Sequence, residues 1–182
     1  MPEAEVADAL RAEREHALVQ AHLPVVWRFL RRLGLSPEDA DDATQEVFVV
    51  AVRKLDCIEP DRERSYLYAI AVRIASRQRR SQNVRSSRTV RVDVDECRSR
   101  EPSADELLDR KDGLAFLDDT LSKMTPDLRT TFALYELEEM TMAEIAVVTE
   151  VPMGTVASRL RRAREQFQEA VKRMQNPTPR QR

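Results

Sequence analysis

The chain has 182 residues, of which 34% are charged and 5% are aromatic, and only three are glycine. This composition excludes a protein built mainly from sheets and predicts an all-α fold. The net charge of −2 is the sum of blocks of opposite sign, because residues 64–92 hold eight Arg and no acid, whereas residues 93–112 hold eight acids and four bases. The segregation predicts one surface for a polyanion and a separate acidic linker.

Several kinds of site are also excluded. The two cysteines, Cys57 and Cys97, are distant from each other and from both histidines, so we expect no metal site, no disulfide framework, and free thiols that are buried or half-buried. The glycines are too scattered for a phosphate-binding loop, and we expect neither a catalytic site nor a cofactor. The longest apolar run, 47–52, is too short to span a bilayer, and the acidic N-terminus does not resemble a secretory signal. We therefore expect a cytoplasmic protein with no membrane insertion.

The first predicted element is a helix from about residue 3 to residue 22. Pro24 is expected to break or kink it, because proline lacks the amide hydrogen that the helical ladder needs. Leu23, Val26, Trp27, Leu30 and Leu33 keep helical spacing, which predicts a second helical segment. Gly34 is expected to end this segment.

Three further segments complete the N-terminal domain, predicted at residues 1–82. A helix begins with Ser36 as N-cap and Pro37 at its first position, and is expected to end near Asp56. A loop follows at 57–63, and then a helix from 64 to about 82. This last helix is expected to bury one side, made of Leu67, Ile70, Ala71 and Ile74, and to carry Arg73, Arg77 and Arg80 together on another.

The C-terminal half is predicted as a flexible linker at 83–112, a second domain at 113–175 and a disordered tail at 176–182. The linker lacks helical periodicity and is rich in Ser, Arg and acids. The domain opens with an apolar stripe formed by Leu114, Leu117, Leu121 and Met124. Thr125 and Pro126 are expected to cap a helix that runs to about Glu138.

Residues 141–164 are typical of two helices joined by a tight turn, the second entered through Pro152 at its first helical position. Apolar residues of this second helix form one stripe, made of Val156, Leu160, Ala163, Phe167, Val171 and Met174. Four polar residues lie off that stripe and are expected to face a partner: Thr155, Ser158, Arg159 and Arg162. A short helix, a turn and an Arg-bearing second helix predict a DNA-binding helix-turn-helix. An ordinary amphipathic surface helix is the alternative.

The predicted chain has two small helical domains joined by a flexible linker, and the C-terminal domain is a helix-turn-helix. This organisation resembles a compact bacterial sigma factor of the extracytoplasmic-function group of the sigma-70 family. Region four of that family carries E-I-A-x-x-x-G-V-P-x-G-T-V-x-S-R-L-x-R-A-R, which residues 144–146 and 151–164 follow closely. Region two carries D-x-x-Q-E-V-F, which appears at 42–48, and an aromatic-Leu-x-x-I-A helix, which appears at 66–71. The two motifs in this order are highly specific.

The resemblance implies a role for each motif. One surface would grip the clamp of core RNA polymerase, and it consists of Asp41, Asp42, Gln45, Glu46 and Phe48. The residues that would hold melted minus-ten DNA are Tyr66, Tyr68, Arg73, Arg77, Arg79 and Arg80, with the loop at 55–63 forming part of a pocket for one flipped base. Those that would contact the minus-thirty-five element of promoter DNA are Thr155, Ser158, Arg159 and Arg162. An anti-sigma factor is implied as a further partner.

The residues by themselves leave alternatives open at each of these sites. Phe48 fits a core position on an ordinary acidic helix, one or both tyrosines fit the core, and Arg159 can bond a neighbouring helix. Glu150 stands where the family has Gly, and a positive φ there would cost on the order of 1 kcal/mol. Two other functions also fit: a stand-alone helix-turn-helix regulator with an N-terminal interaction domain, and an adaptor whose basic helix binds an acidic protein.

Overall fold

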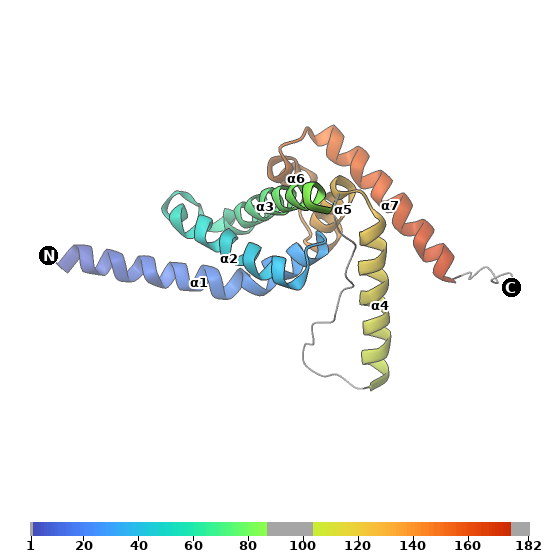
Figure 1. Ribbon diagram of the computed structural model, residues 1–182. Coiled ribbons are helices and arrows are strands. Elements are labelled where there is room, and N and C mark those ends of the chain that lie inside the picture. The colour runs from blue at the N-terminus through green and yellow to red at the C-terminus, as the bar shows by residue number, and fades with distance from the viewer. Residues whose placement is uncertain (1, 87–103, 176–182) are drawn as a thin grey trace. The chain divides into compact units, whose positions relative to one another are not determined.

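The computed structural model describes residues 2–86 and 104–175. Over these two ranges the chain is helical and contains no strand, as the composition predicts. It forms two compact units, one with α1 to α3 and the other with α4, α5, η3, α7 and most of α6 (Figure 1). None of the described helices combines the length and the apolar character that crossing a membrane requires.

The first helix, α1 (Pro2–Arg32), is continuous through Pro24. The predicted break at Pro24 is therefore wrong. A proline inside a helix removes one backbone hydrogen bond and crowds the preceding turn, which costs about 3 kcal/mol. Packing offsets this cost, because Val26, Phe29 and Leu30 are buried just beyond the proline, and each such side chain contributes about 1.5–3 kcal/mol.

The turn between α1 and α2 (Pro37–Arg53) has the predicted caps. Gly34 has a φ of 95°, a backbone conformation that is costly for any residue with a side chain. Its N–H donates to the carbonyl of Arg31 at 2.9 Å. The hydroxyl of Ser36 accepts a hydrogen bond from the backbone N–H of Asp39 at 3.1 Å, and α2 begins with proline. The predicted helix stop and N-cap are confirmed.

Two short 3-10 helices, η1 (Leu55–Cys57) and η2 (Pro60–Arg62), join α2 to α3 (Glu63–Ser86). Asp56 therefore lies in η1 rather than at the end of α2, which stops at Arg53. The thiol of Cys57 is exposed, so its expected burial is wrong. Cys97 lies outside the described residues.

Helices α1, α2 and α3 pack against one another in every pair (Figure 1). Phe29 of α1 meets Tyr68 of α3 edge to face, with ring centroids 4.7 Å apart. The alanines at the helix contacts are fully buried and allow close approach: Ala40, Ala43, Ala51, Ala71 and Ala75. The predicted buried side of α3 is confirmed, since Leu67, Ile70, Ala71 and Ile74 all lie in the core.

Helix occupies both ends of the stretch predicted as linker. α3 continues to Ser86, and α4 (Ala104–Lys123) begins well before residue 113. Residues 83–86 and 104–112 of the predicted linker are therefore helical, because weak apolar periodicity does not stop a chain of good helix formers from forming a helix. The predicted domain bounds themselves stay predictions. Residues 87–103 and 176–182 lie outside the described residues, so their predicted flexibility and disorder stay predictions.

The second unit is built around α7 (Met153–Gln175), which packs on α5 (Pro126–Phe132). Its core joins α4, α5 and α7 through Leu121, Met124, Leu128, Phe132 and Ala163. The outer ends of the two predicted apolar stripes are not covered, since Leu114 and Met174 are exposed. The stripes are therefore shorter than predicted.

α5 ends in a π-helix, η3 (Ala133–Leu137), instead of running regularly to Glu138. The amide of Glu138 donates to the carbonyl of Ala133, five residues back, at 3.0 Å, which is the π spacing. At the other end, Thr125 occupies the N-cap position, but its side chain makes no capping hydrogen bond. The predicted role of Pro126 as the first helical residue is confirmed.

Two non-glycine residues have the left-handed backbone at turns of the second unit. Glu139 has a φ of 54°, and Glu150, in the turn between α6 (Met142–Thr149) and α7, has a φ of 56°. The positive φ considered for Glu150 is thus present. α7 begins at Met153, one residue after Pro152, whose carbonyl accepts the amide of Val156 at 3.1 Å. Pro152 is therefore the N-cap residue, not the first helical residue.

We expect Glu150→Gly to raise the free energy of unfolding by roughly 1 kcal/mol, because glycine removes the steric cost of positive φ. Glu139→Gly should act in the same direction. Urea titration of the full chain, followed by far-ultraviolet circular dichroism, measures the change. Glu165→Gly, in the interior of α7, is the control and should cost about 1 kcal/mol. A loss of stability in both turn variants would contradict the strain at these positions.

Candidate nucleic-acid interface

The predicted polymerase-binding surface lies on α2. Asp41, Asp42 and Gln45 are exposed, Glu46 is half-buried, and Phe48 lies in the core. Burial removes Phe48 from the predicted contact surface and supports its alternative as a core residue. The surface that remains is acidic and polar.

Neighbouring helices hold the two ends of this surface. The indole N–H of Trp27 in α1 donates to Oδ1 of Asp41 at 2.7 Å. The carboxylate of Glu46 forms an ion pair with Arg77 of α3. The side chains of Glu46 and Arg77 are 37% and 62% exposed, and a pair this accessible contributes about 0.2–1 kcal/mol. The predicted polymerase-binding and strand-binding surfaces therefore touch at this ion pair.

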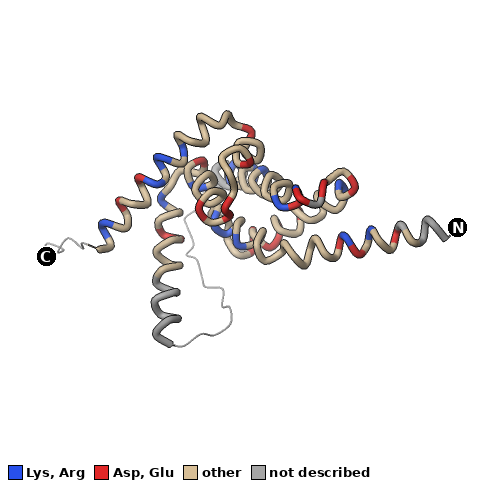
Figure 2. The backbone as a smooth tube through the Cα atoms, turned by 180° about the vertical axis from the view of Figure 1, so that it is seen from behind, with Lys and Arg blue, Asp and Glu red and all other residues tan. Residues whose placement is uncertain are grey.

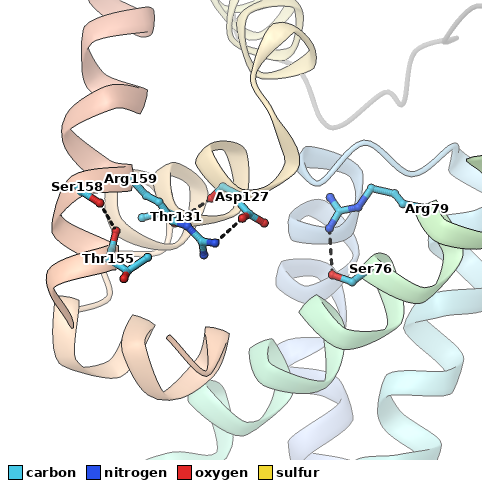
Figure 3. Close-up of polar contacts among 7 residues, drawn as sticks. All are labelled: Ser76, Arg79, Asp127, Thr131, Thr155, Ser158 and Arg159. Atoms are coloured by element: carbon cyan, nitrogen blue, oxygen red, sulfur yellow. Dashed lines mark hydrogen bonds and ion pairs between the residues drawn. The ribbon is translucent and has the colours of Figure 1, made fainter. Parts of the chain in front are cut away.

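The basic side of α3 consists of Arg73, Arg77 and Arg80, all exposed. Their spacing of four and three residues places them on one face, as predicted. Arg79 is different, because it is half-buried and donates to the carbonyl of Leu33 and to the hydroxyl of Ser76, each at 3.2 Å (Figure 3). Arg79 lies about 120° around the helix from Arg73. Arg79 therefore contacts the residue that follows α1, and its predicted role in DNA binding stays a prediction.

The two tyrosines of α3 have different environments. Tyr68 is only 1% exposed and packs against Phe29, with the guanidinium of Arg64 5.5 Å from its ring centroid. Burial of this ring supports the alternative that Tyr68 is a core residue, because a covered ring does not offer a face to a base. Tyr66 is half-buried and keeps an edge available to a partner.

Arginines of α1 anchor the loop predicted to form the base pocket, residues 55–63. Arg14 donates to the carbonyl of Ile58 at 2.6 Å and to the carboxylate of Glu63 at 2.9 Å. Arg11 donates to Asp56 at 2.8 Å. Leu55 and Ile58 insert into the core. These contacts give the loop a defined position at the start of α3.

A capping box begins the helix-turn-helix. The amide and hydroxyl of Thr141 donate to the carboxylate of Glu144 at 2.8 and 2.7 Å, and the amide of Glu144 donates back to the Thr141 hydroxyl at 3.3 Å. Ile145 is fully buried beside it. The Glu-Ile-Ala motif therefore caps α6 and packs it into the core.

Among the predicted minus-thirty-five residues, Arg159 is the one that bonds a neighbouring helix. Its guanidinium forms an ion pair with Asp127 of α5, and its side chain is 24% exposed (Figure 3). Three residues correspond to about 300° of helix rotation, so Arg159 lies only about 60° from the buried Val156. Arg159 therefore flanks the apolar stripe. This position supports the alternative in which Arg159 bonds a neighbouring helix.

The outer face of α7 is opposite Val156. Ser158 and Arg162 are exposed, and Thr155 is half-buried at the edge of this face. Arg161 is also exposed and pairs with Glu165 on its own helix at 2.7 Å. The rest of α7 carries charges of both signs (Figure 2).

Arg164 lies on the other side of the apolar stripe and contacts η3. Its Nε–H donates to Glu136 of η3 at 2.5 Å, and its guanidinium lies 4.9 Å from the ring centroid of Tyr135. The hydrogen bond to Glu136 raises the pKa of Arg164 above its ordinary value, so the guanidinium stays charged. The π-helix places both of these partners, and no sequence signal predicted the contact.

Comparison with known proteins supports the two domains separately. Residues 18–85 match the family Sigma-70 region 2, and residues 117–167 match the family Sigma-70, region 4. The chain is 31% identical to the RNA polymerase sigma-H factor of Pseudomonas aeruginosa, with 74% of each chain covered. It is 34% identical to the ECF RNA polymerase sigma-E factor of Escherichia coli, covering 70% of this chain and 71% of that protein. The chain belongs to the sigma-70 family, in its extracytoplasmic-function group.

Longer relatives and solved structures agree with this assignment. The ECF RNA polymerase sigma factor SigE of Mycolicibacterium smegmatis is 26% identical over 84% of this chain, which spans 59% of that protein. The sigma factor RpoE of Bartonella quintana, solved with the anti-sigma factor NepR, has the same fold, with a TM-score of 0.67 at 22% identity over 85% of this chain and 94% of that one. CnrH, solved with the cytosolic domain of CnrY, also has this fold, with a TM-score of 0.63 at 23% identity. The match covers 88% of this chain and 89% of that one.

Several residues of the sigma-factor motifs have a structural role. Glu144 is exposed but caps α6, and Arg159 forms the ion pair between α5 and α7. Tyr68 and Phe48 lie in the core. Across the described ranges, no cluster of three or more His, Cys, Asp or Glu side chains is arranged to hold a metal ion.

Tyr68→Ala should lower the free energy of unfolding by about 3–5 kcal/mol, the range for truncating a buried aromatic residue. Tyr66→Ala should cost less than half as much, because its ring is half-buried. Urea unfolding of both variants of the full chain measures the difference. Equal losses would contradict the separation of the two tyrosines into core and surface.

Proposed function

We propose that this sigma factor binds core RNA polymerase and directs promoter-specific initiation of transcription, recognising minus-thirty-five and minus-ten elements and helping to melt the DNA. The observation that carries the proposal is the presence of regions 2 and 4 in one chain, each with an exposed charged surface. The function is not catalytic, because polymerase carries out the chemistry. The proposed location is the cytoplasm, where polymerase and promoter DNA are.

The proposed polymerase-binding surface is centred on Asp42 and Gln45, with Asp41 and Glu46 at its edges. All four lie on α2, whose inner side is fixed by buried alanines. An acidic surface on a rigid helix suits a basic partner helix, because complementary charges speed association and fix its register.

The proposed minus-ten surface consists of Arg73, Arg77 and Arg80, with Tyr66 beside them. Arg73 and Arg80 can neutralise phosphates of the separated strand and release counterions, and Arg77 can join them when it leaves its exposed ion pair with Glu46. The exposed edge of Tyr66 offers a contact for an unpaired base. The loop at 55–63 is proposed to hold one flipped base, and its exposed acids, Asp56, Glu59 and Asp61, would keep phosphates away from it.

The proposed minus-thirty-five surface is the outer face of α7. Ser158 and Arg162 are central to it, with Thr155 and Arg161 at its borders. Arg162 has the length to reach a guanine edge, and the hydroxyl groups suit contacts with phosphate. Arg161 is placed at the border because it is exposed and pairs with Glu165 on its own helix.

An anti-sigma factor is a further proposed partner, since RpoE of Bartonella quintana, a sigma factor of similar fold, was solved with the anti-sigma factor NepR. The regulator and adaptor interpretations have less support. Neither explains an acidic helix and a basic helix combined in a region 2 domain.

Run-off transcription with purified core polymerase on fragmented genomic DNA tests the function directly. The chain should yield discrete transcripts that core polymerase alone does not. Dimerisation with tight operator binding in the absence of polymerase would favour a regulator. Binding to an acidic protein without any salt-dependent DNA binding would favour an adaptor.

Asp42→Lys should weaken binding to core polymerase by about tenfold or more, because a like charge facing a basic partner costs more than ~1.4 kcal/mol. Titration of labelled polymerase measures the affinity. Glu13→Lys, an exposed acid on α1 of the same unit, is the matched control and should bind as the unaltered chain does. Equal affinities for all three proteins would refute this surface.

Arg73→Ala combined with Arg80→Ala should reduce promoter opening more than polymerase binding, because the two charges are proposed to hold the melted strand. Permanganate footprinting on a promoter found by run-off transcription reports the open bubble. Removing two exposed cations outside this face, Arg28 and Lys54, is the control. An undiminished bubble in the Arg73 and Arg80 variant would mean that this face only carries solvated charge.

A further inference from the structure

The contact that holds α7 in its unit is narrow. Val156, Leu160 and Ala163 are the buried residues of this 23-residue helix, with Phe167 partly covered. Apolar contacts are not directional, and small side chains such as alanine present little relief. The stripe therefore decides which side of α7 faces outward, but it fixes the finer rotation of the helix about its own axis only coarsely.

Two ion pairs lie on opposite flanks of that stripe. Arg159 lies about 60° to one side of Val156 and pairs with Asp127, and Arg164 lies about 80° to the other side and bonds Glu136. Both acids come from the segment that precedes the helix-turn-helix, in α5 and η3. Bonds of fixed geometry on both sides resist rotation in either direction.

The partners of Arg159 make it a poor DNA contact. Its guanidinium is already paired with a carboxylate, and its side chain is mostly covered. An Arg that releases counterions from DNA must bring uncompensated positive charge to a phosphate. Here Asp127 cancels that charge and would itself repel phosphate.

We infer that Asp127 is a positioning residue for minus-thirty-five recognition: by holding Arg159, opposite the Glu136–Arg164 pair, it sets the rotation of α7 that presents Ser158 and Arg162 to DNA. The inference rests on the proposed function. It attributes the effect of Arg159 on minus-thirty-five specificity to its bond with α5, and not to a contact between Arg159 and a DNA base.

The test uses holoenzyme assembled from the full chain and core polymerase. Unaltered holoenzyme first selects a preferred minus-thirty-five sequence from a duplex pool randomised in that region. The affinity of each variant is then measured for the selected duplex and for a scrambled one, and the ratio of the two gives the specificity. Circular dichroism and thermal melting confirm that each variant remains folded.

Arg159→Ala and Asp127→Ala should each lower the specificity ratio by the same factor, about two- to fivefold, which corresponds to the contribution of an exposed ion pair. Asp127→Asn should behave like Asp127→Ala. Exchanging the two charges, with Asp127→Arg and Arg159→Asp in one chain, should restore most of the ratio. Glu169→Ala removes an exposed pair with Arg173 within α7 alone, and should leave the ratio unchanged.

The charge exchange separates positioning from contact. If Arg159 reads a base, the exchanged chain should be worse than Arg159→Ala, because it places a carboxylate at the DNA, and Asp127→Ala should have no effect. Either result overturns the inference and leaves the proposed function standing. Failure of the unaltered holoenzyme to select any sequence overturns both.

Discussion

Burial of one side of each helix is the constraint on which every proposed surface depends. On α3, packing of Leu67 and Ala71 against the other helices carries Tyr68 into the core and leaves Arg73, Arg77 and Arg80 outside. On α7, the same effect at Val156 and Leu160 leaves Ser158 and Arg162 outside. The residues of a motif therefore form a contact surface only where their positions around the helix expose them. Ser158 and Arg159 are neighbours in sequence, but only Ser158 lies on the outer face.

Polar contacts between helices then decide which of the remaining charges are available. Glu46 and Arg77 neutralise each other between α2 and α3, Arg159 is held by α5, and Trp27 holds Asp41. Each of these bonds joins a residue that lies in or beside a proposed surface to a neighbouring helix of its own unit. The surfaces are therefore organised before a partner arrives, which lowers the entropy that binding must overcome.

Local signals in the sequence predicted the helical class, the Gly34 stop, the Ser36 cap and the buried side of α3, because a few adjacent residues determine each of them. The capping box at Thr141 was readable by the same logic from its Thr-x-x-Glu spacing. The roles of Arg79, Arg159 and Arg164 were not, since their partners lie 28 to 46 residues away in sequence. The continuity of α1 through Pro24 likewise depends on packing.

The hydrogen bond between Trp27 and Asp41 has a consequence for optical measurements. Trp27 is the single tryptophan of the chain, so indole fluorescence arises from the first unit alone. The indole is half-buried and its N–H touches a carboxylate at the edge of the acidic surface on α2. Emission is sensitive to the polarity and hydrogen bonding around the ring, so the chain contains a built-in reporter beside that surface, while the second unit is silent at the same wavelength.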